Sequence, residues 1–167
     1  MENNDIVVTS RIRLARNLKN YKFPINMTHD ESDNVIKEIN KAINTHDKNY
    51  KLTYMKDLSD VQTNSLIENH IISPALAKKR DDGAFLLSPD QKVSIMINEE
   101  DHIRIQTLGD GLSLKECWNL SNNIDDILEE NIEYAFDREL GYITSCPTNI
   151  GTGMRASVML HLPALSI

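Results

Sequence analysis

Three separated segments of the sequence share one alternation, with arginines at every second position and aliphatic residues between them. TSRIRL places Arg11 and Arg13 in this pattern, HIRIQ places Arg104, and MRASVML places Arg155. Successive side chains of a strand point to opposite faces. The alternation therefore predicts three half-buried strands, with four arginines projecting from the polar face of one sheet.

A face that carries several guanidinium groups suits a phosphorylated ligand, because each group is a permanently charged fork that matches phosphate oxygens. Arg11, Arg13 and Arg16 also lie within six residues of one another, in a chain whose formal net charge is −7. Local clusters in an acidic protein favour a small anion over a nucleic acid. Spacing alone leaves a second interpretation open, in which solvated arginines pair with the 25 acidic residues. Neither a Walker A sequence nor the glycine-rich loop of protein kinases is present.

Three consecutive acids, Glu99, Glu100 and Asp101, follow the strand-like run VSIMI and precede IRI. Consecutive carboxylates repel one another and have poor strand propensity. Beside a phosphate site they would attract a cationic acceptor such as a guanidinium group. The alternative is an ordinary polar turn or bulge after a strand.

Periodicity and turn signals indicate an α+β fold, with a mixed or mostly antiparallel sheet and helices packed on one of its faces. Thr28 is the expected N-cap of a helix over 28–46. Ser59 with Gln62, and Ser113 with Glu116, match capping boxes that would open helices reaching residue 72 and residue 136. Strands are expected at 5–15, 50–55, 83–88, 92–98, 102–106, 141–147 and 154–162, the third and fourth forming a hairpin across PDQ.

Composition places the chain among ordinary globular proteins, with 167 residues, 40 % of them apolar. No run of 18 apolar residues and no signal peptide is recognisable, so no membrane span is expected. The net charge of −7 argues against a nucleic acid or an anionic membrane as the main partner. Cys117 and Cys146 are too few for a disulfide framework. We expect a cytoplasmic protein.

Three motifs, SRIRLARN, NEEDHIRI and CPTNIGTGMRASVMLHLPAL, resemble the phosphagen (guanidino) kinase family in content and order. The likeness covers essentially the whole chain and is greatest to the bacterial protein arginine kinase branch. The resemblance implies the family's catalytic-domain fold over 1–167 as a single domain. Because LPALSI ends without a final helix, we expect this domain to be incomplete at its C-terminus.

The resemblance also implies transfer of the γ-phosphoryl group of ATP to a guanidino nitrogen, with Mg²⁺ held mainly by phosphate oxygens and no protein metal site. Glu100 matches the family's catalytic carboxylate, and Cys146 its reactive cysteine, whereas Cys117 is expected to pack inside. The implied nucleotide-binding residues are Thr9, Ser10, Arg11, Ile12, Arg13, His70, Arg104, Arg155, Ala156, Ser157, Val158 and Met159.

By the same resemblance the acceptor is an arginine side chain of a protein, in bacterial stress response and protein quality control. Because SRIR begins at residue 10, we expect the helical domain that precedes it in kinases of small guanidines to be absent, and an open acceptor site suits a protein substrate. Implied partners are a Clp-family unfoldase, a stress-gene repressor and a zinc-binding activator, with a homodimer in the full-length protein.

Two alternatives stay open. One is a kinase of free arginine. The other is an inactive nucleotide- or partner-binding fragment, because the family's further nucleotide-binding arginine and second catalytic glutamate follow the segment that matches HLPAL.

Overall fold

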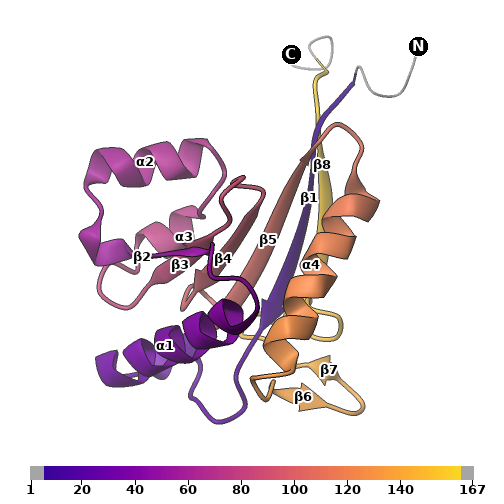
Figure 1. Cartoon of the computed structure of the whole chain (residues 1–167). Coiled ribbons are helices and arrows are strands. Elements are labelled where there is room, and N and C mark those ends of the chain that lie inside the picture. The colour runs from indigo at the N-terminus through magenta and orange to yellow at the C-terminus, as the bar shows by residue number, and fades with distance from the viewer. Residues whose placement is uncertain (1–5, 163–167) are drawn as a thin grey trace.

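A six-stranded antiparallel sheet organises the chain in the computed structural model, which describes residues 6–162 (Figure 1). Its strands are β1 (Val7–Arg16), β2 (Lys51–Tyr54), β3 (Ala84–Leu87), β4 (Val93–Ile97), β5 (Ile103–Asp110) and β8 (Met154–Leu160). They lie in the order β2-β3-β4-β5-β1-β8, and each neighbouring pair is antiparallel. The predicted α+β class and the hairpin across PDQ are thereby confirmed. Asp5 and the residues after Leu162, which the predictions also touched, lie outside the described residues.

The α-helices of the described part of the chain are α1 (His29–His46), α2 (Asp60–Glu68), α3 (Pro74–Ala77) and α4 (Leu114–Glu129). Short 3₁₀ turns occupy Pro24–Asn26, Met55–Asp57 and Pro147–Asn149. The predicted N-cap Thr28 is confirmed and forms a capping box with Glu31 at the start of α1, and the predicted capping box of Ser59 with Gln62 opens α2. Each satisfies backbone N–H groups that would otherwise have no partner in the first turn.

Helices α1 and α4 lie side by side on one face of the sheet and form the larger core with it (Figure 1). Ile36 and Ile39 of α1, Leu128 of α4 and Ile95 and Ile105 of the sheet are completely buried there. Burying one such side chain contributes about 1.5–3 kcal/mol. This core fixes which face of β1 and β5 the arginines must occupy.

The prediction that all helices share one face is wrong. Phe85 and Met96, opposite one another on β3 and β4, face the other way and pack with Ile72 and with Leu76 of α3. Helices α2 and α3 therefore cover the β3–β4 part of the second face. The alternation along β3 and β4 is obscured in the sequence because both faces of these strands are buried and apolar.

Helix α4 is shorter than predicted and begins differently. It ends at Glu129 rather than continuing to Phe136, which is exposed on β6 (Phe136–Asp137). Ser113 precedes α4 but makes no capping hydrogen bond; its backbone N–H donates to Ser10 Oγ at 3.0 Å. A partner more than a hundred residues away replaces the predicted capping box.

Most of the strand predicted over 141–147 is also wrong. Only β7 (Gly141–Tyr142) is extended, and it pairs with β6 in a two-stranded ribbon. The following residues form a loop because their polar groups bond elsewhere: Ser145 N donates to Asp101 Oδ1 at 2.7 Å, and Pro147 opens a 3₁₀ turn.

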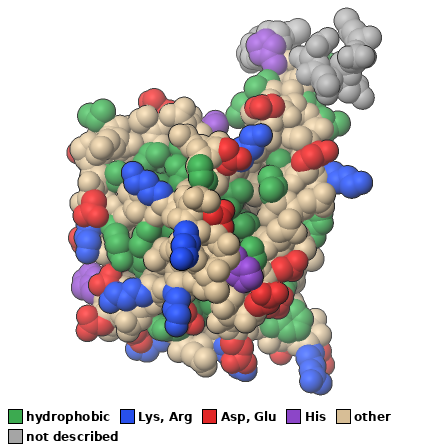
Figure 2. All heavy atoms as spheres, in the orientation of Figure 1, with side chains coloured by type: hydrophobic (Ala, Val, Ile, Leu, Met, Phe, Trp, Pro, Cys, Tyr) green, Lys and Arg blue, Asp and Glu red, His purple; other side chains and the backbone are tan. Residues whose placement is uncertain are grey.

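Acidic and basic side chains are interspersed on the face of the molecule that Figure 2 shows, with apolar side chains between them. Among the described residues, no helix is both long enough and apolar enough to cross a membrane.

Candidate functional site

Four arginines gather on the second face of the sheet, beside the part that α2 and α3 cover. Arg13 of β1 lies opposite Arg155 of β8, and Arg104 of β5 lies opposite Ala15 of β1. Arg11, two residues before Arg13, donates from Nε to Ser157 Oγ at 3.3 Å. The predicted common face of these arginines is confirmed.

Burial and electrostatic repulsion from the neighbouring arginines lower the pKa values of Arg11 and Arg13. Burial lowers the pKa of Arg11, and the positive charges of Arg104 and Arg155 lower it further. Arg13 is affected more strongly: burial and the same neighbours, with Arg11, lower its pKa to about 10, against a weaker opposing effect of Glu99. The Arg13 Nε is buried and has no hydrogen-bond partner among the residues that the structure describes. A polyanion between these side chains would relieve the repulsion and satisfy the unpaired donor.

At one end of the arginine cluster lies a pocket of about 250 Å³, lined by Thr9, Arg11, His70, Leu108, Ser157, Val158 and Met159. Six of these seven were predicted to bind nucleotide; Leu108 was not, since an aliphatic residue on a strand carries no distinguishing signal. His70 has a left-handed backbone (φ 59°), and its carbonyl accepts from Gln106 Nε2 at 2.6 Å. This bond holds the loop between α2 and α3 against β5.

Four residues predicted to bind nucleotide lie on the other face of the sheet, at paired positions of β1 and β8: Ser10 with Val158, and Ile12 with Ala156. Ile12, opposite Ala156, belongs to the core on the α1–α4 face, so both side chains leave the arginine face. Ser10 is buried and donates to Gly111 O at 2.7 Å. Only the backbone of these residues is available to a ligand on the arginine face, because alternate residues of a strand face opposite ways.

The three consecutive acids have three different environments. Glu99 is 2 % exposed, and its Oε1 accepts from Arg104 Nη1 at 2.5 Å and from Ser73 Oγ. Asp101 is equally buried and accepts from Asn17 Nδ2 and Ser145 N, each at 2.7 Å. Only Glu100 is open to solvent, with a side chain 46 % exposed and Oε2 3.8 Å from Arg104 Nη2. The buried acids fix the turn, and Glu100 is free to meet a ligand.

Asp101 also brings the segment that contains Cys146 to the acidic turn. Ser145, next to Cys146, donates from Oγ to the backbone carbonyl of Glu100 at 2.8 Å. The partly exposed Cys146 has Sγ 3.0 Å from Thr148 Oγ1. The predicted catalytic pair, Glu100 and Cys146, is thus held in one neighbourhood.

A second pocket, of about 590 Å³, opens beside the acidic turn. Its lining residues are Ile25, Ala75, Lys78, Lys79, Glu99, Glu100, Arg104 and Ser145. Arg104 also lines the narrow space between Arg13 and Arg155. The pocket beside His70, the arginines and the acidic pocket therefore follow one another across the sheet.

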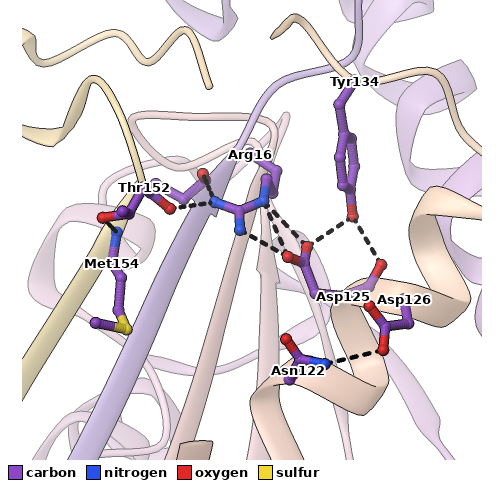
Figure 3. A network of polar contacts seen from close by, with 8 residues as sticks. Arg16, Asn122, Asp125, Asp126, Tyr134, Thr152 and Met154 are labelled. Carbon is purple, nitrogen blue, oxygen red and sulfur yellow. Dashed lines mark hydrogen bonds and ion pairs between the residues drawn. The ribbon is translucent and has the colours of Figure 1, made fainter. Parts of the chain in front are cut away.

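Arg16, the third arginine of the first cluster, does not face the site. It is buried against α4, where Nη2 lies 2.6 Å from Asp125 Oδ2 (Figure 3). Its guanidinium carbon lies 3.6 Å from the ring centre of Tyr142. Tyr134 donates to Asp125 Oδ1 at 3.1 Å. Arg16 Nη1 also donates to Thr152 O at 2.9 Å, which fastens the loop before β8 to the end of β1.

Gly153 completes this attachment. Its φ is +60°, and a Cβ at this position would lie 2.5 Å from Ala15 O and 2.6 Å from Arg16 Nη1. Ala15 N donates to Gly153 O at 2.8 Å. Because Arg155 follows two residues later, the buried Arg16 sets where the last arginine of the cluster lies.

Residues that sequence reasoning did not single out include Asn17, Ser73, Lys78 and Lys79. Asn17 stands at the end of SRIRLARN, so the motif could have identified it. Ser73 and the two lysines have no local signature. Their role depends on the packing of α3 against the acidic turn.

The arrangement can hold a polyphosphate between the arginines and a cationic group at Glu100. Arg104 lines both places, so a group transferred from the polyphosphate to the cationic group at Glu100 would pass next to Arg104. Such juxtaposition is the main contribution a protein makes to phosphoryl transfer.

Comparison with known proteins agrees with this chemistry. Residues 32–167 match the family model described as ATP:guanido phosphotransferase, C-terminal catalytic domain. The protein-arginine kinase of Desulforamulus reducens is 50 % identical over 97 % of this chain and 47 % of its own length. That of Clostridium tetani is 43 % identical over 100 % of this chain and 49 % of its own. The chain spans about half the length of these curated relatives.

Solved structures share the fold. Lombricine kinase superposes with a TM-score of 0.81 at 29 % identity, over 98 % of this chain and 50 % of its own. The duplicated taurocyamine kinase from Schistosoma mansoni, with bound transition state analog components, superposes with a TM-score of 0.86 at 24 % identity. The match covers 96 % of this chain and 24 % of the taurocyamine kinase chain.

Proposed function

The chain belongs to the ATP:guanido phosphotransferase family, and from this premise we propose that it transfers the γ-phosphoryl group of ATP to arginine side chains of proteins. One observation carries the proposal: four arginines on one sheet face lie next to a turn in which Glu100 alone is exposed. The curated relative from Desulforamulus reducens, which is 50 % identical in sequence to this chain, is named a protein-arginine kinase, and this name supports an arginine of a protein as the acceptor.

Each half of the site has a role in this reaction. The nucleoside of ATP would occupy the pocket of His70 and Ser157, and its phosphates would lie across the arginines. Guanidinium groups would compensate the charge on the phosphate oxygens as the transferred group moves. Because they are fixed to three neighbouring strands, little reorganisation is needed when the charge shifts.

Glu100 would act on the acceptor. A guanidinium group is a poor nucleophile while protonated, and its pKa in water is above about 12. The exposed carboxylate of Glu100 can accept from two of its N–H groups, orient one nitrogen toward the γ-phosphorus and take up the proton released. The new N–P bond forms as the bond to the bridging oxygen breaks, giving phosphoarginine, ADP and a proton. Cys146, as a thiolate, would add negative charge beside the same guanidinium.

Magnesium fits this site only as a complex with the nucleotide. The arginines repel a free cation, whereas phosphate oxygens and water are the ligands Mg²⁺ prefers. Glu100, exposed beside Arg104, can accept a hydrogen bond from a metal-bound water. When bound, the metal would neutralise charge on the β- and γ-phosphates.

A small guanidine compound is the second candidate acceptor, favoured by the similarity to lombricine kinase. The volume of the acidic pocket, about 590 Å³, accommodates either a free guanidine or a peptide side chain with its neighbours.

The wider setting is also a proposal that rests on the resemblance. It consists of a cytoplasmic location, a role in stress response and protein quality control, a homodimer in the full-length protein, and contacts with a Clp-family unfoldase, a stress-gene repressor and a zinc-binding activator.

The test is transfer from γ-labelled ATP to a mixture of proteins and, separately, to free arginine. We expect acid-labile, base-stable label on protein, lost with Glu100→Gln. Label on free arginine alone would replace the proposal by the second candidate. Absence of label on both acceptors, with ATP still bound, would leave a nucleotide-binding protein without turnover.

A further inference from the structure

The basic run Lys78, Lys79 and Arg80 at the end of α3 is divided between two tasks. Arg80 is engaged in the fold, because Nη1 donates to Leu58 O at 2.5 Å and Nη2 forms an ion pair with Asp60. Lys78 and Lys79 instead line the pocket of the acidic turn. Within residues 6–162, neither lysine forms an ion pair. Two cations are therefore available to a ligand at this place.

This pocket has charge of both signs. Glu99, at 2 % exposure, belongs to its interior, whereas Ile25, at 82 %, belongs to its rim, and Lys78 is exposed. Pockets of about 300–1,000 Å³ hold ligands of the size of drugs. At about 590 Å³ the pocket has room for an arginine side chain and for residues next to it in a peptide.

We propose that Lys78 and Lys79 select protein segments in which the target arginine is flanked by aspartate or glutamate. This inference rests on the proposed function, since it concerns the same acceptor pocket. The arginine would meet Glu100, and carboxylates beside it would meet the two ammonium groups. The same ammonium groups would repel a segment with basic flanks. Attraction of acidic flanks and repulsion of basic flanks would therefore both contribute to specificity.

The expected effect is moderate, because these ion pairs are exposed. Two such pairs should strengthen binding about three- to tenfold at low ionic strength. The preference should shrink as salt is added, because the Debye length falls to about 8 Å at physiological ionic strength. ATP binding should not change, since Lys78 and Lys79 lie outside the nucleotide pocket.

Fluorescence anisotropy with three labelled peptides tests the proposal on the full chain in the presence of ADP. The first peptide carries arginine between aspartates, the second carries arginine between asparagines, and the third carries citrulline, an uncharged isostere of arginine, between aspartates. We expect the first to bind more tightly than both others. Lys78→Ala with Lys79→Ala should remove the advantage of the first peptide over the second.

Two further variants control for charge and folding. Lys37→Ala with Lys41→Ala removes the same charge from exposed positions of α1, on the opposite face of the sheet, and should leave the preference intact. Lys78→Glu with Lys79→Glu should reverse it, so that a peptide with lysine flanks binds more tightly than the one with aspartate flanks.

The outcomes separate the two proposals. If the arginine peptides bind better than the citrulline peptide, but aspartate and asparagine flanks are equivalent, the role of the two lysines is refuted while the acceptor pocket stands. If citrulline binds as tightly as arginine, the pocket does not recognise a guanidinium group, and the proposed function fails there.

Discussion

Replacing Asp125 by alanine should destabilise the protein by about 3–5 kcal/mol, the usual cost of breaking a buried ion pair from one side. The side chains of Arg16 and Asp125 are only 4 % and 9 % exposed. Without the carboxylate, Arg16 keeps a buried positive charge with two carbonyl partners, Ala15 O and Thr152 O. Since a domain of this kind is stable by only about 5–15 kcal/mol, the loss should be large.

Urea unfolding followed by circular dichroism measures this change. Two matched variants set the scale: Tyr134→Phe removes the hydroxyl that donates to Asp125 Oδ1 at 3.1 Å and to Asp125 O at 3.5 Å, and should cost about 1–2 kcal/mol. Asp126→Ala removes the neighbouring carboxylate, which is exposed and bonds to Asn122, and should have little effect. If Asp125→Ala were no less stable than Asp126→Ala, Arg16 would not depend on its partner, and our account of how the loop before β8 is held would be refuted.

Three further predictions concern the site itself. Gly153→Ala should cost about 1–3 kcal/mol in urea unfolding, because φ is +60° and the new Cβ would collide with Ala15 O and Arg16 Nη1; unchanged stability would contradict the geometry. The lowered pKa of Arg13, about 10, means that its positive charge disfavours the fold below pH 10. A bound anion compensates that charge, so ATP or sulfate should raise the melting temperature of the wild type more than that of Arg13→Gln. Equal shifts would show that Arg13 does not bind the anion. Glu100→Gln should lower the transfer rate about 10²- to 10⁴-fold with the affinity for ATP unchanged in a binding titration, and a parallel loss of both would assign Glu100 to the fold.

The shared face of the arginines could be predicted because alternation is a local property of a strand. The alternation within each segment was enough to assign its arginines to the polar face of that strand. This holds for Arg11, Arg13, Arg104 and Arg155. Arg16 shows where sequence proximity misleads. It lies three residues from Arg13 and therefore on the other face, and its partner Asp125 is 109 positions away.

The acidic run illustrates the same limit. Sequence reasoning selected Glu100 as the residue that acts on the acceptor, but it could not separate the tasks of Glu99 and Asp101. Those tasks depend on Ser73 and Asn17, which lie 26 and 84 positions away. The predicted capping box of Ser113 and Glu116 is absent for a related reason, because Ser10 of β1 accepts the hydrogen bond from the Ser113 backbone N–H that Glu116 was expected to accept.

Localising the transferred phosphoryl group on a peptide tests the central claim most directly. The peptide would contain one arginine, one lysine and one serine, and would be incubated with the chain and MgATP, kept at neutral to basic pH and sequenced by mass spectrometry. We predict one added phosphoryl group, on arginine, and none with Glu100→Gln. Phosphate on serine or lysine, or equal phosphorylation by the variant, would contradict the assignment of the sheet face and the acidic turn to guanidino phosphorylation.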